Sequence, residues 1–521
     1  MNELRLKPTL SGGETLQSFA SRLAAINMRP TLYPFCKDLG IDLDAVMMGR
    51  DEGIAAICSL GGLSFRAFDR SLVRQDGKGK WIGAELVPDM KLRRGYARFC
   101  PLCAQRSLAE SKFNFECSLP DHIDQWAPWI ETCVEHNARY VEILIPDEAK
   151  LYTNYPVERA AIAFHNKEAV LAAIQAPQYQ EATDFEKYIA RRIRGDAERR
   201  ELIHDLSLPG LADIAEAIGR VFFGKAPRPI EEADRMRYRD VGFGFISRDY
   251  DHFRKSMLAR WPGENSFVLP NRFGGFPVWL MKVAQASNLH TQFVPHLARL
   301  IAETSAVGPE DLVMGQPVAR RVWHSPISIG SALKVAPPTI WRVARGSGAI
   351  NDGPQSRPLS EYLIEAAVGD EMIQAIRNAT SEAEVAKSLE TKPQTVRALV
   401  DVGVLSHLPG TGVPGVDALI NRDEVAELLS ELAAAAPVNR SSDDLPILTI
   451  VKRTRARVSD LIAAIVERRL PAERIETPVT FPNLRISVEA ALAAIEGPGF
   501  VKSSRPSRSV SWRKSGYRLG R

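Results

Sequence analysis

Three cysteines and one histidine, spaced in two short pairs, are the residues of this sequence best suited to chemistry. Cys100 and Cys103 enclose Pro-Leu, and Cys133 and His136 enclose Val-Glu. Two such pairs of soft ligands match one tetrahedral Zn²⁺ held by three thiolates and one imidazole. Four protein ligands leave no position open for water, so the pattern predicts a structural zinc site rather than a catalytic one.

Two alternatives to this assignment stay open at the level of sequence. The pairs can be a chance C-x-x-C and an unrelated C-x-x-H, or Cys117, with His122 nearby, can replace one ligand. The spacer also contains Trp126 and Trp129, which we expect to pack against the metal-bound turns because a zinc module has little core of its own. The alternating segment Tyr140–Ile145 predicts a strand that closes the module.

The composition predicts a multi-domain globular protein. A chain of 521 residues corresponds to three or four domains of roughly 150 residues each, and 45% hydrophobic with 25% charged residues is ordinary for such a chain. No apolar run reaches the roughly 20 residues of a membrane span, and the N-terminus lacks the apolar core of a signal peptide. We therefore expect a cytoplasmic protein whose cysteines are metal ligands or core residues rather than disulfides.

The positive charge is concentrated at the C-terminal end. Val451–Arg521 contains fifteen Lys/Arg and six Asp/Glu, a net charge of +9. Since the whole chain has a net charge of +4, the preceding residues carry a net charge of −5. Lys502–Arg521 alone contains seven basic residues and no acidic one. This asymmetry predicts a nucleic-acid contact, with Arg513 and Lys514 among the phosphate-binding residues, unless the tail is only a solvated end.

The first half of the chain has the apolar spacing of short helices. The predicted helices here are Gly13–Ala24, Thr31–Leu39, Leu43–Met48, Asp51–Leu60, Ser64–Leu72, Asp184–Ile193 and Leu208–Phe223. Asp51–Leu60 and Ser64–Leu72, joined by two glycines, have a helix-turn-helix-like layout, although a small bundle without DNA contact fits equally well. Trp81–Val87 predicts a strand, and residues 147–305 are interpreted as helical scaffold.

Three later segments have the pattern of a helix-turn-helix. The first is Ser328–Val343, and the third is the basic run Lys452–Arg457 followed by a helix at Val458–Val466, with Ser459 or Asp460 as its cap. The middle segment, Ser381–Leu408, has the clearest pattern.

The middle segment resembles a winged helix-turn-helix of excisionases and related regulators. Ser381 and Glu384 predict a capping box, Pro393 suits the start of the second helix, and a Gly/Pro-rich hairpin follows before a helix at Asn421–Leu432. Short polar side chains at the start of a recognition helix read base edges. The candidate DNA-binding residues of the three segments are Lys392, Gln394, Thr395, Arg397, Thr339, Arg342, Lys452, Arg453, Arg455 and Arg457, and Trp341 and Arg345 are expected to project beside Arg342. The alternative is a helical hairpin that only packs.

Together these patterns predict a mainly α, multi-domain fold with an N-terminal zinc-finger module and C-terminal helix-turn-helix domains. The predicted domains are 1–150, with a helical segment and a zinc finger; 151–310, a helical scaffold; 311–350, a helix-turn-helix; 370–440, a winged helix-turn-helix; and 441–521, a basic helical DNA-binding region and tail.

The first 150 residues carry a resemblance to a known family. Gly13–Asn27 contains a set of residues that recur in its N-terminal signature: Glu14, Leu16, Ser18, Arg22, Leu23 and Asn27. Together with C-P-x-C and the later C-x-x-H, this resembles the TniQ/TnsD family of transposon target-site selection proteins. The departures from the family pattern are Thr15 for Ser, Phe19 for Trp, Val134 for Pro and Asn137 for Gly, and they leave the four ligands intact.

The resemblance implies a non-enzymatic, zinc-containing adaptor in DNA transposition, in a bacterial, nucleoid-associated setting. Such a protein recognises double-stranded attachment-site DNA, or docks on an RNA-guided CRISPR complex, and recruits an AAA+ ATPase regulator of the TnsC/TniB type. The added C-terminal modules favour direct reading of DNA. A helix-turn-helix transcriptional regulator and a metal-dependent nuclease with dispersed carboxylates are the alternatives, although no P-loop, G-x-S-x-G or H-E-x-x-H motif occurs. The stoichiometry stays open, and a homodimer is one arrangement.

Overall fold

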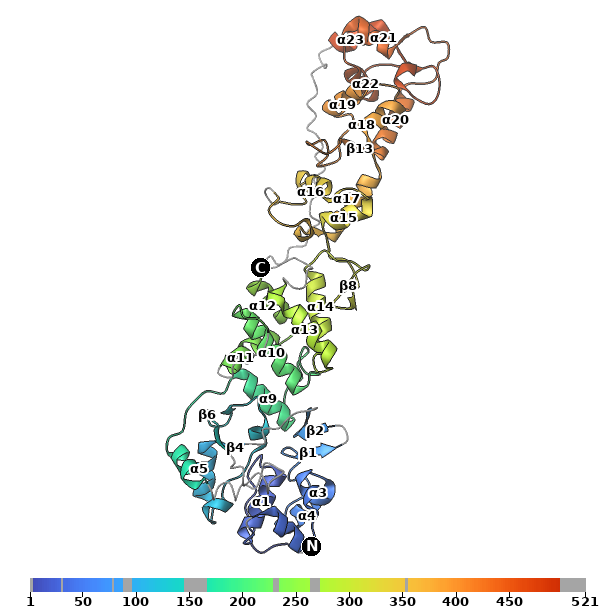
Figure 1. The fold of residues 1–521 in the computed structure, drawn as a ribbon. Helices are drawn as coiled ribbons and strands as arrows, with labels where there is room; N and C mark the ends of the chain where they lie inside the picture. Colours follow the sequence, from blue (N-terminus) through green and yellow to red (C-terminus); the bar gives the residue numbers. More distant parts are fainter. Residues whose placement is uncertain are drawn as a thin grey trace. The chain divides into compact units, whose positions relative to one another are not determined.

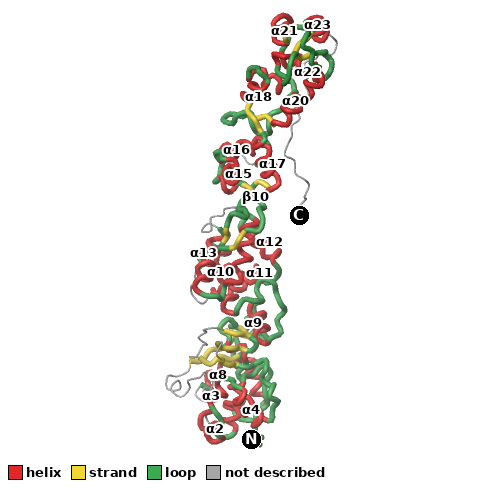
Figure 2. The backbone as a smooth tube through the Cα atoms, turned by 90° about the vertical axis from the view of Figure 1, so that its right-hand side faces the viewer, coloured by secondary structure: helices red, strands yellow, loops and turns green. Residues whose placement is uncertain are grey.

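The computed structural model describes residues 3–29, 31–76, 79–87, 96–144, 166–227, 234–262, 272–351 and 355–496 (Figure 1). Helices dominate these residues, and their strands are short (Figure 2), which confirms the mainly α fold. The chain forms two compact units, one within residues 3–297 and the other within 298–496. The finer domain boundaries stay predictions, and the basic tail lies outside the described residues. None of the described helices has the length and apolar character needed to cross a membrane.

The first unit begins with a small helical core. Its helices are α1 (Leu16–Ile26), α2 (Leu32–Leu39), α3 (Leu43–Met47) and α4 (Asp51–Gly61). α1 starts where the Thr15 side chain accepts a hydrogen bond from the Ser18 amide. Leu16, Phe19 and Leu23 are fully buried on it, and the Phe19 ring lies 5.8 Å from that of Phe68. Phe19 thus fills the core position at which the family has a tryptophan.

The predicted helix Ser64–Leu72 is wrong, and with it the helix-turn-helix layout of this region. The segment consists of successive turns in which Ala67, Asp69 and Ser71 donate to carbonyls only three residues earlier. Two tertiary contacts favour this path over a helix. Phe68 is buried in the core, and the Ser71 hydroxyl donates to the Glu14 carbonyl at 2.7 Å.

Three small antiparallel sheets follow. They consist of β1 (Val73–Asp76), β2 (Gly79–Ile82) and β3 (Glu85–Val87); β4 (Tyr96–Phe99) with β7 (Val141–Leu144); and β5 (Thr132–Cys133) with β6 (Ala138–Arg139). The single strand predicted at Trp81–Val87 is wrong, because Gly83 (φ 57°) turns the chain between β2 and β3. A side chain at Gly83 would meet the Ile193 carbonyl oxygen at 2.1 Å, so only glycine fits there. β7 confirms the strand predicted at Tyr140–Ile145.

Helices build the rest of the first unit. The α-helices are α5 (Pro101–Glu110), α8 (Lys167–Gln175), α9 (Asp184–Arg194), α10 (Leu208–Phe222), α11 (Arg235–Ile246), α12 (Tyr250–Arg260), α13 (Phe276–Ala286) and α14 (Val294–Glu303). The boundary between the two units falls within α14. Short 3-10 turns accompany them: η1 (Phe115–Cys117), η2 (Ile123–Trp126), η5 (Phe273–Gly275) and η6 (Thr291–Phe293). α9 and α10 confirm the helices predicted at Asp184–Ile193 and Leu208–Phe223. α10 and α11 approach closely through Gly219 and Gly242, since a Cβ on Gly242 would lie 1.8 Å from the Ala215 oxygen.

Gly242→Ala is therefore expected to destabilise the α10–α11 pair by about 1–3 kcal/mol through overpacking. Gly244 on the same helix is the matched control, because a Cβ there has open space around it. Gly244→Ala is expected to be neutral or to stabilise the helix by up to about 1 kcal/mol. Hydrogen exchange of peptides from α10 and α11 in the full chain measures the difference, and equal protection in both variants would refute the close-packing account.

The second unit repeats one supersecondary structure three times, after a small hairpin of β8 (Leu312–Val313) and β9 (Gln316–Pro317). Module 1 contains β10 (Trp323–His324), α15 (Pro326–Leu333), α16 (Pro337–Gly346), η7 (Leu359–Glu361), β11 (Ile364–Glu365) and α17 (Ala366–Arg377). Module 2 contains β12 (Ala379–Ser381), α18 (Glu382–Ser388), α19 (Pro393–Asp401), β13 (Leu419–Asn421) and α20 (Arg422–Ala435). Module 3 contains β14 (Leu445–Pro446), α21 (Ile447–Thr454), α22 (Val458–Val466), β15 (Glu473–Arg474), η8 (Phe481–Asn483), β16 (Leu484–Ile486) and α23 (Val488–Glu496).

Each module has the element order of a winged helix-turn-helix. A strand precedes two helices, a second strand returns antiparallel to the first, and a third helix closes the module. The turns between the first two helices match in backbone conformation, with positive φ at Lys334 (56°), Glu390 (50°) and Arg455 (58°), and the next helix begins three residues later in every case. The structure thus places two helices joined by a turn in each of the three predicted segments and adds a strand pair and a third helix to each, whereas their assignment as helix-turn-helix domains stays a prediction.

Candidate metal centre and nucleic-acid interface

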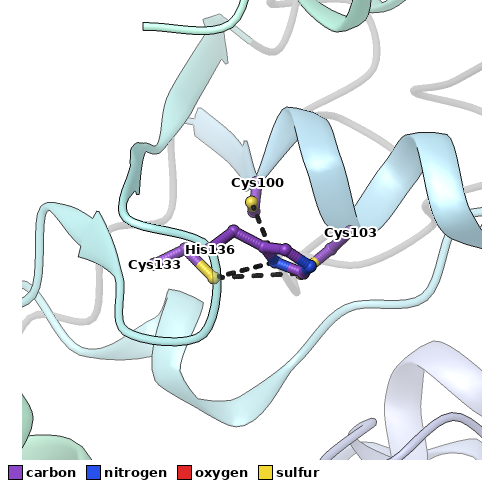
Figure 3. Close-up of side chains that lie close together, drawn as sticks. All are labelled: Cys100, Cys103, Cys133 and His136. Atoms are coloured by element: carbon purple, nitrogen blue, oxygen red, sulfur yellow. Dashed lines mark hydrogen bonds between the residues drawn. The ribbon is translucent and has the colours of Figure 1, made fainter. Parts of the chain in front are cut away.

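Cys100, Cys103, Cys133 and His136 lie together in the first unit. Their ligand atoms all fall within 4.8 Å of one another (Figure 3). His136 Nδ1 is 3.7, 3.2 and 3.6 Å from the sulfurs of Cys100, Cys103 and Cys133, and the last two sulfurs are 3.9 Å apart. Ligands at Zn–S and Zn–N distances of about 2.3 and 2.0 Å in a tetrahedron stand about 3.5–3.8 Å from one another. The donor set and its spacing therefore fit a zinc ion.

The start of α5 and the turn between β5 and β6 direct the four ligands toward one point (Figure 3). β4 leads into Cys100, the N-cap of α5, and Pro101 at the first helical position starts the turn that carries Cys103. Cys133 ends β5, and His136 lies in the tight turn to β6. The pairing of β5 with β6 holds this turn closed, and the Asn137 amide donates to the Cys133 carbonyl at 2.8 Å.

Asn137 explains one departure from the family pattern. Its φ is 51°, in the left-handed region that glycine adopts most readily and asparagine tolerates best among the other residues. Its side-chain oxygen also accepts a hydrogen bond from the Ala182 amide at 3.1 Å. Asparagine thus keeps the turn that the family makes with glycine and adds a contact to the segment before α9.

The three thiols of the cluster shift one another's pKa values. Hydrogen bonds from Cys100 and Cys103 hold the pKa of Cys133 far below its ordinary value. Hydrogen bonds with Cys100 and Cys133, together with burial, raise the pKa of Cys103 far above its ordinary value. Thiolates are the form that ligates metal, so a cation in this cluster would take all three sulfurs as thiolates.

Buried charged side chains hold the second ligand pair in place. Glu186, fully buried on α9, accepts hydrogen bonds from the amides of Glu131 and Thr132 at 2.7 and 2.9 Å, directly before Cys133. Burial raises the pKa of Glu186 although these amides lower it. Arg98 on β4 donates to the carbonyls of Ala127 and Ile130 at 3.1 and 2.6 Å. The loop that carries Cys133 is therefore fixed from two sides.

The N-terminal signature residues form a buried network that docks the metal module on α1. Arg22 pairs with both carboxylate oxygens of Glu14 at 2.9 and 2.8 Å and donates through Nε to the Cys117 carbonyl at 2.8 Å. The Ser18 hydroxyl donates to Glu14 at 2.9 Å and accepts from the Asp121 amide at 2.8 Å. These residues thus tie α1 to the segment between the two ligand pairs.

The remaining residues of the predicted module lie outside the cluster. The sulfur of Cys117 does not belong to the group of ligand atoms found among the described residues. Trp129 is buried, whereas Trp126 is half-buried and donates from its indole to Asp121 at 3.1 Å. All six cysteines lie in the described part of the chain and none forms a disulfide.

Residues 5–139 match the family model described as TniQ. This part of the chain is a TniQ domain. Searches among curated proteins and among solved structures give no match. The match covers the signature residues of α1 and all four ligands, which confirms the resemblance to the TniQ/TnsD family, and a TniQ domain associates the chain with DNA binding in transposition.

Outside the TniQ domain, the predicted DNA-binding residues of module 2 gather at the start of α19. Lys392 is the N-cap, and Lys392, Gln394 and Arg397 are exposed while Thr395 is half-buried. The opposite face of α19 is buried through Val396 and Leu399. The capping box of Ser381 and Glu384 is present as predicted. α19 therefore presents a polar N-terminal turn from a fixed position, although the guanidinium of Arg397 is also paired with Glu382 at 2.8 Å.

Module 1 differs from the expectation in one residue. The prediction that Trp341 projects from α16 is wrong, because this side chain is buried in the module's core beside Tyr362. Thr339 is half-buried and Arg345 is exposed. Arg342 is exposed but donates to the carbonyl of Gly415 in the wing of module 2 at 3.2 Å.

Module 3 presents its basic residues but not its second helix. Lys452, Arg453, Arg455 and Arg457 are all exposed. α22, by contrast, is buried against α19 and α20 in one hydrophobic core that modules 2 and 3 share. The prediction that Ser459 or Asp460 caps α22 is wrong, because Arg457 occupies the N-cap of this helix and Ser459 is buried. Arg513 and Lys514 lie outside the described residues.

Proposed function

We propose that this chain selects the target site in DNA transposition by reading double-stranded DNA through α19. The exposed polar N-terminus of α19 in a winged helix-turn-helix is the observation that carries the proposal. Side chains at this position of a recognition helix enter the major groove, and arginine discriminates guanine there. The TniQ domain supports the connection to transposition.

The other basic residues have a different role in this proposal. Lys452, Arg453, Arg455 and Arg457 surround the turn between α21 and α22, and α22 itself is buried. Charges on a turn without an exposed reading helix contact phosphates, which position a protein on DNA without specifying sequence. Arg513 and Lys514 add to the same electrostatic attraction.

The four-ligand cluster has a structural role in this proposal. Cys100, Cys103, Cys133 and His136 would hold a Zn²⁺ whose binding supplies folding energy to the TniQ domain. The domain then presents a rigid surface to an AAA+ ATPase regulator, which is recruited to the DNA that the second unit has bound. A transcriptional regulator would share the winged modules but would not recruit an ATPase.

Arg397→Ala is expected to weaken binding to the preferred DNA sequence by about 1–3 kcal/mol and to leave the affinity for scrambled DNA nearly unchanged. The preferred sequence is first selected from a random-sequence duplex library with the full chain. The matched comparison is the double variant Lys452→Ala, Arg453→Ala, which removes two phosphate contacts. It should weaken both duplexes alike and reduce the salt slope by roughly 0.9 per contact. If Arg397→Ala leaves the sequence preference intact, α19 is not the reading helix.

A further inference from the structure

One buried carboxylate of module 2 joins its second helix to its wing. Glu382, the first residue of α18, is 8% exposed. Its Oε2 accepts a hydrogen bond from Arg397 Nη2 at 2.8 Å, and its Oε1 accepts one from His407 Nε2 at 2.9 Å. Arg397 keeps 65% of its side chain exposed. We propose that Glu382 is a positioning residue that orients Arg397 for reading a base pair and couples it to the wing; this inference rests on the proposed DNA reading by α19.

The carboxylate is held in its charged form. Burial raises the pKa of Glu382, but the hydrogen bonds and charges of Arg397 and His407 outweigh it and leave this pKa below its ordinary value. Glu382 also lies in the first turn of α18, where the helix dipole favours a negative charge. The ion pair with Arg397 is therefore present at neutral pH.

The geometry leaves Arg397 able to bind a base. A guanidinium has five N–H donors in a planar fork, and Glu382 accepts from Nη2 alone. An arginine that is already anchored at one end loses less conformational entropy when it binds a base. The cost of immobilising one long side chain corresponds to about two- to tenfold in affinity, so the anchor should improve affinity by up to this factor. His407 adds a second anchor, because it precedes the wing and pairs with Ile420 of β13.

The other two modules lack this arrangement at the corresponding positions. Arg397 follows the turn residue Glu390 by seven positions, and the same step from Lys334 and Arg455 leads to Trp341 and Ile462, which are buried. The first helices of those modules begin with Pro326 and Ile447 in place of Glu382. Among the three described modules, only module 2 thus has, in place of a buried apolar side chain, an exposed arginine paired with a buried carboxylate. This difference marks α19 as the helix specialised for reading.

Glu382→Gln tests the inference, because glutamine keeps the size and one acceptor but loses the charge. The probes are the duplex selected from the random library by the unmodified full chain, its single-base-pair variants and a scrambled duplex. Glu382→Gln is expected to lower discrimination at the base pair read by Arg397 about two- to tenfold, with unchanged affinity for the scrambled duplex. That unchanged affinity, and an unaltered circular dichroism spectrum, show that the variant is folded.

Glu384→Gln is the matched control, since it removes a charge from the same turn of α18 and glutamine still completes the capping box. It should leave discrimination unchanged. A higher affinity of Glu382→Gln for every duplex would mean that Glu382 withholds Arg397 from DNA, and this overturns the positioning role. Unchanged discrimination in Glu382→Gln also overturns it while leaving the proposed function intact. If the unmodified chain selects no sequence, the proposed function and this inference both fail.

Discussion

Replacing Cys133 with serine is expected to remove the metal from the chain and to unfold the TniQ domain locally. The unmodified chain should carry about one Zn²⁺ on its three thiolates and one imidazole, and binding at such closed sites contributes about 10–16 kcal/mol in small zinc modules. Serine is a poor zinc ligand, so the module should lose most of this energy. Elemental analysis of the purified chain measures the metal, and limited proteolysis between residues 96 and 144 measures the unfolding.

Cys117→Ser is the matched control for this prediction. Cys117 is as buried as Cys133 and lies in the same module, but it is outside the ligand cluster. The control variant should keep its zinc and its resistance to protease. Full zinc occupancy in Cys133→Ser, or loss of zinc in Cys117→Ser alone, would contradict the ligand assignment.

Removing the Glu14 carboxylate is the change expected to have the next largest effect. Glu14 and Arg22 are 1% and 6% exposed, and Glu14→Ala leaves the Arg22 charge buried without its partner. Breaking a buried pair in this way costs about 3–5 kcal/mol. Hydrogen exchange of α1 and of the segment 117–123 should therefore accelerate together, because the same network joins both.

Lys187→Ala provides the comparison, since Lys187 forms an ion pair with Glu181 in which both side chains are exposed. Such surface pairs contribute about 0–1 kcal/mol. If Glu14→Ala accelerates exchange no more than Lys187→Ala does, the signature residues do not hold the metal module on α1.

The ligand set could be predicted from sequence because it depends on a few residue types at short spacing. Two C-x-x-C-type pairs constrain the ligands locally, and the structure adds only how β4, α5 and the β5–β6 turn bring them together. The role of Glu14, Ser18 and Arg22 could not be predicted in this way. These residues follow a family pattern, but their partners Cys117 and Asp121 lie about a hundred positions away, and no periodicity in the sequence reports such a pairing.

Local signals also explain where the predictions were wrong. The apolar residues of Ser64–Leu72 fit a helix, but the burial of Phe68 and the hydrogen bond from Ser71 to Glu14 favour turns. The helix at Val458–Val466 was predicted from its own pattern, whereas its burial depends on packing against α19 and α20. That the three segments repeat one structure could not be predicted from the sequence, because the modules share turn geometry and apolar spacing rather than residues.

The proposed coupling of DNA reading to ATPase recruitment is tested most directly by a footprint on the selected duplex. Nuclease protection is measured with the full chain alone, with only an AAA+ ATPase regulator of the TnsC/TniB type encoded beside it, and with both in the presence of ATP. The account predicts protection of one site by the chain, and protection extending beside that site only when both proteins are present. ATPase protection that is the same with and without the chain would contradict it.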